Sequence, residues 1–218
     1  MNDQQIHEAM ALLRQECRQW PSPSVTVVAQ QYRSPFTVLI SCIISLRTRD
    51  AVTAEASERL FGRADTPQTM GRLTEEQIAA LIYPTGFYRV KSQQIQAICH
   101  RLMEDFDGIV PDTIDQLTSF KGVGRKTANL VVTLGYGKPG ICVDIHVHRI
   151  TNRWGYVTTG TPDKTELALR QKLPPEYWIE INDLLVSYGQ HRCFPATPAC
   201  SCCPLASLCK RIGVLRSR

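Results

Sequence analysis

Four cysteines in the last quarter of the chain constrain its structure more than any other feature. Cys193, Cys200, Cys203 and Cys209 follow the pattern C-x6-C-x2-C-x5-C. A set of four thiolates is typical of a [4Fe–4S] cluster or of a structural zinc ion. Zinc sites usually take their ligands from two tight C-x2-C pairs, and only one such pair is present here. The spacing therefore favours a [4Fe–4S] cluster, and zinc is the alternative.

A fifth cysteine, Cys202, lies inside this run. Adjacent residues seldom both reach one cluster, so we expect Cys202 not to be a ligand; a shifted register in which it replaces Cys203 stays open. The chain has nine cysteines, and its polar first residues do not resemble an export signal. Both features favour a reducing compartment, where thiols are free or bind metal. We expect the cytoplasm, with association to the nucleoid if the source is prokaryotic.

Apolar residues recur at helical spacing through most of the chain. Thr74 with Gln77 resembles a capping box, and Thr161 before Pro162 resembles a helix start. The β-prone segment Val25–Val28 has no hairpin signal after it, and we predict that it is helical. No apolar run is long enough to cross a membrane. These patterns predict an all-α protein of roughly ten helices joined by short loops.

A glycine-containing turn separates two of the predicted helices. It consists of Lys121, Gly122, Val123, Gly124 and Arg125. The two glycines permit positive φ angles and leave backbone amides accessible. The N-terminus of the following helix attracts anions. We therefore predict a hairpin that binds DNA phosphates without reading sequence, and an ordinary corner between two helices is the alternative.

Lys126 follows this turn, at the start of a segment that is apolar nearly all round. Such a helix is buried, so we expect the Lys126 ammonium to be partly desolvated. Desolvation, the neighbouring Arg125 and the positive end of the helix all disfavour the charged ammonium and favour a nucleophilic amine. A surface lysine that contacts phosphate is the alternative.

Asp144 is a carboxylate inside the apolar segment that precedes the next predicted helix. A buried carboxylate needs a cation, a helix N-terminus or a catalytic task. We expect Asp144 to be catalytic, an N-cap, or both. His146, at the start of that helix, is an expected DNA contact rather than a metal ligand, because no partner ligands lie near it in the sequence.

Together these residues resemble the endonuclease III branch of the helix–hairpin–helix DNA glycosylases. The hairpin, Lys126, Asp144 and the four cysteines occur in the family's order, and Lys126 and Asp144 lie 18 positions apart, as in the family. The resemblance implies two α-helical lobes with DNA between them. A six-helix barrel is expected at residues 28–138, and an iron–sulfur cluster lobe at residues 1–27 and 139–218.

The resemblance also implies an activity. A base-excision DNA glycosylase with apurinic/apyrimidinic (AP) lyase activity would remove oxidised pyrimidines, such as thymine glycol, from damaged double-stranded DNA. The nucleotide would be flipped out of the duplex, and the Lys126 amine would attack C1′, expel the base and form a Schiff base. Asp144 would stabilise positive charge at C1′ and help to deprotonate the amine, and β-elimination would cut the strand. We expect a monomer that does not bind membranes.

Two positions depart from the family pattern where relatives fill the gap left by the flipped base. Arg47 stands in place of a glutamine and can pair with guanine. Phe87 stands in place of a leucine and can intercalate, or else it is a core aromatic. These departures motivate an alternative glycosylase, for mismatched thymine or pyrimidine dimers. The non-enzyme alternative is a DNA-structure-binding protein that uses the hairpin alone.

Overall fold

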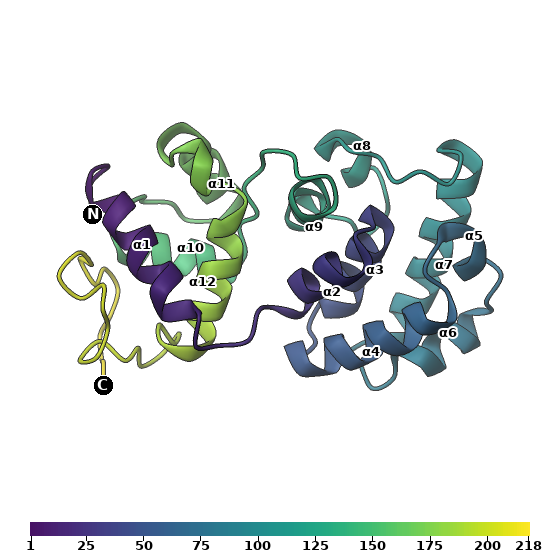
Figure 1. Cartoon of the computed structure of the whole chain (residues 1–218), viewed down its shortest axis with the longest axis horizontal. Coiled ribbons are helices and arrows are strands. Elements are labelled where there is room, and N and C mark those ends of the chain that lie inside the picture. The colour runs from purple at the N-terminus through teal and green to yellow at the C-terminus, as the bar shows by residue number, and fades with distance from the viewer. The chain divides into compact units, whose positions relative to one another are not determined.

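The computed structural model describes every residue from Met1 to Arg218, and its regular elements are all helical (Figure 1). No β-strand forms, which confirms the predicted all-α class. The chain divides into two compact units: one is Ser24–Lys138, and the other joins Met1–Pro23 to Pro139–Arg218. The first boundary lies slightly before the expected residue 27, because a helix begins at Ser24. None of the helices has the length and apolar character needed to cross a bilayer.

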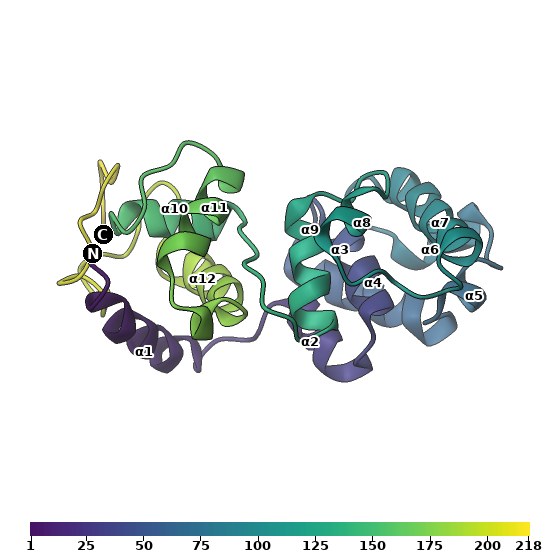
Figure 2. The ribbon, with the colours of Figure 1, turned by 90° about the horizontal axis from the view of Figure 1, so that it is seen from above.

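The unit Ser24–Lys138 is built around one apolar helix, α3 (Pro35–Ser45). Every α3 residue from Phe36 to Ile44 is buried, as expected of a helix without a polar face. Helices α2, α4, α7 and α9 pack against it, and Figures 1 and 2 both place α9 beside α3. The remaining bounds are α2 (Ser24–Tyr32), α4 (Asp50–Arg63), α5 (Pro67–Met70), α6 (Glu75–Ile82), α7 (Tyr88–Asp105), α8 (Ile114–Thr118), α9 (Arg125–Leu130) and the π-helical turn η1 (Val131–Gly135).

Local sequence signals fix several helix starts. The Thr74 hydroxyl accepts from the Gln77 amide, and the Gln77 side chain returns a bond to the Thr74 amide, so the predicted capping box is confirmed. Thr161 caps α11 (Pro162–Lys172) by accepting from the Lys164 amide. The β-prone segment Val25–Val28 lies inside α2, as predicted. Val25 and Val28 are buried in the packing of this unit, where α2 contacts α3, whereas Val27 is exposed, so tertiary packing overrides the β propensity of the segment.

The other unit contains both ends of the chain. Its helices are α1 (Gln5–Cys17), α10 (Ile145–Arg153), α11 (Pro162–Lys172) and α12 (Glu180–His191), with a 3₁₀ turn η2 (Pro175–Tyr177) before α12. The N-terminal amine of Met1 donates to the carbonyl of Trp154 at 2.9 Å. The apolar face of α1 packs into the same core as α10 and α12. Met10, Ile150, Trp154 and Tyr188 are buried in this core. Residues 192–218 form irregular loops on this core.

Candidate functional site

The predicted hairpin joins α8 to α9 and has the expected turn. Gly122 adopts φ +79°, and a Cβ atom there would lie 2.2 Å from the side-chain nitrogen of Gln94, so only glycine fits. Gln94 donates to the carbonyl of Lys121 at 3.1 Å. Gly124 is the N-cap of α9 with φ −92°, so it does not use the positive φ that was expected of both glycines. Lys121, Gly122 and Gly124 are exposed, whereas Val123 is buried.

A side chain of α7 contacts the segment that leads into the hairpin. Arg101 donates to the carbonyl of Ser119 at 2.5 Å and to its hydroxyl at 3.0 Å. The same guanidinium lies 4.6 Å from the ring centroid of Phe120, which is buried. These contacts fix the chain immediately before the turn, so the exposed amides are presented by a rigid backbone.

Lys126 lies in the first turn of α9, directly after the hairpin. The four residues that follow it, Thr127–Leu130, are buried, in agreement with the predicted buried helix. The side chain of Lys126 itself is exposed within this unit, not partly desolvated as expected, because α9 turns its apolar face toward α3. The charge of Lys126 is felt by the thiol of Cys42, whose pKa is raised to about 12 by burial and is lowered slightly by this lysine.

Asp144 is buried, with 7% of its surface exposed, and it is the N-cap of α10. Its Oδ1 accepts from the amides of His146 at 2.8 Å and Val147 at 2.9 Å. The N-cap interpretation is therefore confirmed, and it does not compete with a chemical role. Two backbone hydrogen bonds at the N-terminus of the helix hold the carboxylate in place.

Helix α10 connects Asp144 to the cysteine-rich loop. His146 is half-buried and lies against Gly189 of α12, where a Cβ would come within 2.2 Å of its Nδ1. Arg149 lies 3.0 Å from the same Nδ1 and donates to the carbonyl of Cys193 at 2.8 Å. Arg153, one turn further along, donates to the carbonyl of Phe194 at 2.7 Å. Sequence reasoning missed both arginines; their spacing of four residues, which places them on one face of α10, is the signal that could have identified them.

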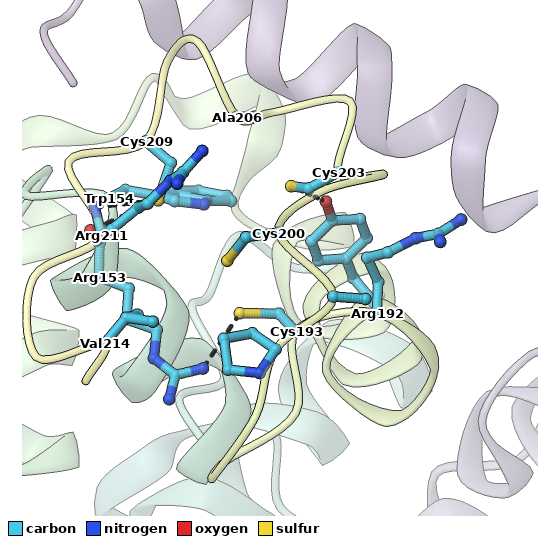
Figure 3. A pocket seen from close by; sticks show the side chains of 13 residues that line it. Arg153, Trp154, Arg192, Cys193, Cys200, Cys203, Ala206, Cys209, Arg211 and Val214 are labelled. Atoms are coloured by element: carbon cyan, nitrogen blue, oxygen red, sulfur yellow. Dashed lines mark hydrogen bonds between the residues drawn. The ribbon is translucent and has the colours of Figure 1, made fainter. Parts of the chain in front are cut away.

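The four cysteines of the motif line one pocket (Figure 3). Three arginines share its wall: Arg153, Arg192 and Arg211. Cys202 is not among the lining residues. Its side chain is exposed, and the Arg192 guanidinium donates to its sulfur at 2.9 Å. The register that uses Cys203 is therefore the one that the pocket favours.

Hydrogen-bond donors face three of these sulfur atoms. Arg153 donates to Cys193 Sγ at 3.3 Å, and the Tyr188 hydroxyl lies 2.9 Å from Cys203 Sγ. The sulfur of Cys209 accepts from a backbone amide two residues further on, at 3.4 Å. Burial raises the pKa of the Cys203 and Cys209 thiols, so their thiolates would need positive charge in the pocket. No three Cys, His, Asp or Glu side chains are grouped as for a single metal ion.

Arg47 and Phe87 form an exposed pair at one end of the unit Ser24–Lys138. Arg47 lies in the loop between α3 and α4, and Phe87 is the N-cap of α7. The Arg47 guanidinium lies 5.4 Å from the Phe87 ring centroid. Phe87 is 61% exposed, so the alternative that it is a core aromatic is wrong. The sequence did not predict that the two side chains would meet.

Both the sequence and the fold match proteins of base-excision repair. Residues 40–175 match the model of the HhH-GPD superfamily base excision DNA repair proteins. The chain is 45% identical to endonuclease III of Thermotoga maritima over 176 residues, which cover 81% of this chain and 83% of that protein. It is similar to a non-covalent endonuclease III–DNA complex (TM-score 0.83, 32% identity, 97% and 96% covered). It is also similar to a trapped endonuclease III–DNA covalent intermediate (TM-score 0.76, 34% identity, 82% and 84% covered).

Proposed function

The chain belongs to the endonuclease III branch of the HhH-GPD superfamily of base-excision repair proteins, a branch of DNA glycosylases and AP lyases, and we propose that Lys126 and Asp144 carry out its chemistry. The observation that carries this assignment is the position of Lys126, two residues beyond the N-cap of α9 and directly after the hairpin. The substrate that we propose is an oxidised pyrimidine in duplex DNA, of the thymine glycol type.

Lys126 supplies the nucleophile. After the damaged nucleotide leaves the base stack, the lysine amine attacks C1′, and the base departs with the electrons of the glycosidic bond. The amine loses its protons and the sugar ring opens, which leaves a Schiff base between Nζ and C1′. Loss of a proton from C2′ then expels the 3′ phosphate, and the strand is cut by β-elimination. An exposed side chain on a rigid first turn can reach such a target.

Asp144 supplies negative charge. Its carboxylate is held by two backbone amides at the N-terminus of α10, so it cannot rotate freely. We propose that it stabilises the positive charge that develops at C1′ and accepts a proton from the attacking amine. Because the hydrogen bonds already exist before substrate binds, no reorganisation is needed in the transition state.

The hairpin binds the DNA backbone in this proposal, and salt dependence tests it. Replacing Lys121 by alanine removes one exposed cation, so the slope of log affinity against log salt should become less negative by about 0.9. The matched control is Lys138→Ala, which removes a lysine that pairs with Asp112 away from the hairpin. Fluorescence anisotropy titrations at several salt concentrations give both slopes. Equal slopes for Lys121→Ala and the unaltered protein would argue against a phosphate contact there.

Arg47 and Phe87 are proposed to enter the space that the flipped nucleotide leaves. Their exposed side chains present a cation beside an aromatic ring. Phe87 can fill the gap between base pairs, and Arg47 can hydrogen-bond to the orphaned base. Arg125 and His146 are proposed as further DNA contacts. Arg125 begins α9 after the hairpin, and His146 lies two residues after the Asp144 cap.

We propose that Cys193, Cys200, Cys203 and Cys209 hold a [4Fe–4S] cluster. A cluster of four irons and four sulfides is wider than a single ion, so its ligands surround a pocket instead of converging on one point. That arrangement agrees with the four thiols that line one pocket. Arg153, which donates to Cys193 Sγ, would offset part of the negative charge of the thiolates, whereas Arg192 already pairs with Glu16. When bound, the cluster would fasten the loops of residues 192–209 to α10 and α12.

A pair of adjacent cysteines provides a matched test of this ligand set. Cys203→Ser should strongly lower the bound iron and the visible absorbance. Cys202→Ser should leave both near the values of the unaltered protein, because of these two cysteines only Cys203 lines the pocket. Iron and sulfide analysis after purification gives the result without any activity assay. Full iron content in Cys203→Ser, or a zinc-loaded protein after expression with added iron, would contradict the proposed cluster.

The substrate class is tested by trapping with borohydride on a set of duplexes. Duplexes with thymine glycol, a thymine–guanine mismatch, a pyrimidine dimer or an abasic site are each incubated with the protein and reductant. We expect an adduct with thymine glycol and with the abasic site. An adduct with the mismatch or the dimer in place of thymine glycol would favour the alternative substrates. Binding without an adduct on any duplex would indicate a DNA-structure-binding protein.

A further inference from the structure

Lys91 is a buried lysine that has no role in the proposed reaction, and it contacts the loop that carries Arg47. We propose that Lys91 is a positioning residue that holds these two side chains in the conformation in which they enter DNA. The proposal rests on the proposed function, in which Arg47 and Phe87 occupy the space of the flipped nucleotide. It concerns DNA opening alone and is independent of the identity of the nucleophile.

The Lys91 ammonium connects the two loops that carry the pair. It donates to the carbonyl of Ile44 at 2.6 Å, at the C-terminal end of α3, and to the hydroxyl of Thr48 at 2.8 Å. The same Thr48 hydroxyl accepts from the amide of Gly86 at 3.1 Å. Thr48 lies one residue after Arg47, and Gly86 lies one residue before Phe87. One lysine thus ties both loops together through a single hydroxyl group.

The backbones of Arg47 and Phe87 need such support. Both are non-glycine residues with positive φ, +51° and +58°. Residues other than glycine rarely adopt this backbone conformation, which persists only where the surrounding structure enforces it. The two loops also touch directly, because a Cβ atom on Gly86 would lie 2.5 Å from the carbonyl oxygen of Arg47. The contact requires glycine, and it sets the distance between the two side chains.

The burial of Lys91 is costly without a task of this kind. Only 4% of the residue is exposed, and no carboxylate pairs with its ammonium. Burial lowers its pKa to about 8. An unpaired buried cation is expensive, and a methionine of similar volume would fill the space with fewer costs. The hydrogen-bond partners of Lys91, Ile44 and Thr48, lie on either side of Arg47 in the sequence. This placement indicates that the ammonium group positions Arg47 and, through Thr48, Phe87.

The test measures DNA opening without any bond cleavage. The full chain is titrated onto a duplex that carries a tetrahydrofuran abasic analogue, which has no base to lose, opposite 2-aminopurine, whose fluorescence reports stacking. Lys91→Met should weaken binding to this duplex by roughly tenfold, the effect of losing hydrogen bonds from one charged group, and should reduce the fluorescence change. The matched control, Lys138→Met, removes a surface lysine of the same unit and should leave both unchanged.

Thr48 provides a second, independent pair of variants. Thr48→Val removes the hydroxyl that joins Lys91 to Gly86 and should reproduce the Lys91→Met defect, whereas Thr48→Ser keeps the hydroxyl and should restore binding. If circular dichroism shows that Lys91→Met does not fold, the comparison of Thr48→Val with Thr48→Ser tests the proposal in its place. Wild-type fluorescence and affinity in folded Lys91→Met, or in folded Thr48→Val, would overturn the proposal.

A double-variant cycle separates positioning from general stabilisation. If Lys91 acts through Arg47 and Phe87, Lys91→Met should cost no further affinity in a background in which both Arg47 and Phe87 are replaced by alanine. A merely structural lysine would instead give additive losses, which would also overturn the proposal. The result is distinct from a failure of the proposed chemistry, because the abasic analogue is not cleaved. Absence of a borohydride adduct would refute the Lys126 assignment and leave this measurement unaffected.

Discussion

Lys126→Ala is expected to abolish the borohydride-trapped adduct and to slow base excision by roughly a thousandfold or more, as for loss of a nucleophile in other covalent mechanisms. Alanine cannot form a Schiff base, so β-elimination is lost with it. Folding should be preserved, because the Lys126 side chain is exposed on the first turn of α9. Single-turnover rates on a thymine glycol duplex and gel analysis of the adduct measure the two effects.

Lys121→Ala is the matched control for this experiment. Lys121 lies in the same hairpin, five positions earlier, and its side chain is also exposed. Its loss should weaken DNA binding. The adduct should still form when the protein concentration is well above the dissociation constant for DNA. If the adduct instead disappears in Lys121→Ala and persists in Lys126→Ala, the nucleophile has been assigned to the wrong lysine.

Asp144→Asn is expected to lower turnover by orders of magnitude while the protein stays folded. Asparagine caps a helix about as well as aspartate, so the free energy of unfolding should change by about 1 kcal/mol or less. The substitution removes the charge that stabilises C1′ and keeps a side-chain oxygen near the amides of His146 and Val147. Single-turnover kinetics combined with denaturant unfolding separate the two roles.

Asp144→Ala completes the comparison, since it removes the cap and the charge together. It should lose activity like Asp144→Asn and should also lose about 1 kcal/mol of stability. If Asp144→Asn turns over at nearly the normal rate and Asp144→Ala is merely less stable, Asp144 has a capping role only.

Local signals in the sequence were sufficient for much of the fold. Thr74 and Thr161 cap the helices that their spacing predicts, because N-caps depend on neighbours within one turn. The hairpin glycine Gly122 has the positive φ that a tight turn requires. Of the adjacent thiols Cys202 and Cys203, only Cys203 lines the pocket, and the assignment of the four ligands stays a prediction.

Other features depend on contacts between distant segments, which periodicity does not reveal. The meeting of Arg47 with Phe87 joins two loops forty residues apart, and their φ angles are visible only in three dimensions. Lys91 appears as one more basic residue on an amphipathic helix until its partners are seen. The exposure of Lys126 was mispredicted because a buried helix was taken to bury its first turn as well.

The residue that bears the trapped sugar is the most direct measurement of the central claim. The borohydride-reduced adduct is digested with nuclease and protease, and mass spectrometry locates the added deoxyribose remnant. The modification is expected on Lys126, in the peptide that follows the hairpin. The N-terminal amine of Met1 is the obvious rival nucleophile, although it donates to the carbonyl of Trp154 and burial lowers its pKa. A remnant on Met1, or on any lysine other than Lys126, would contradict the mechanism proposed for this protein.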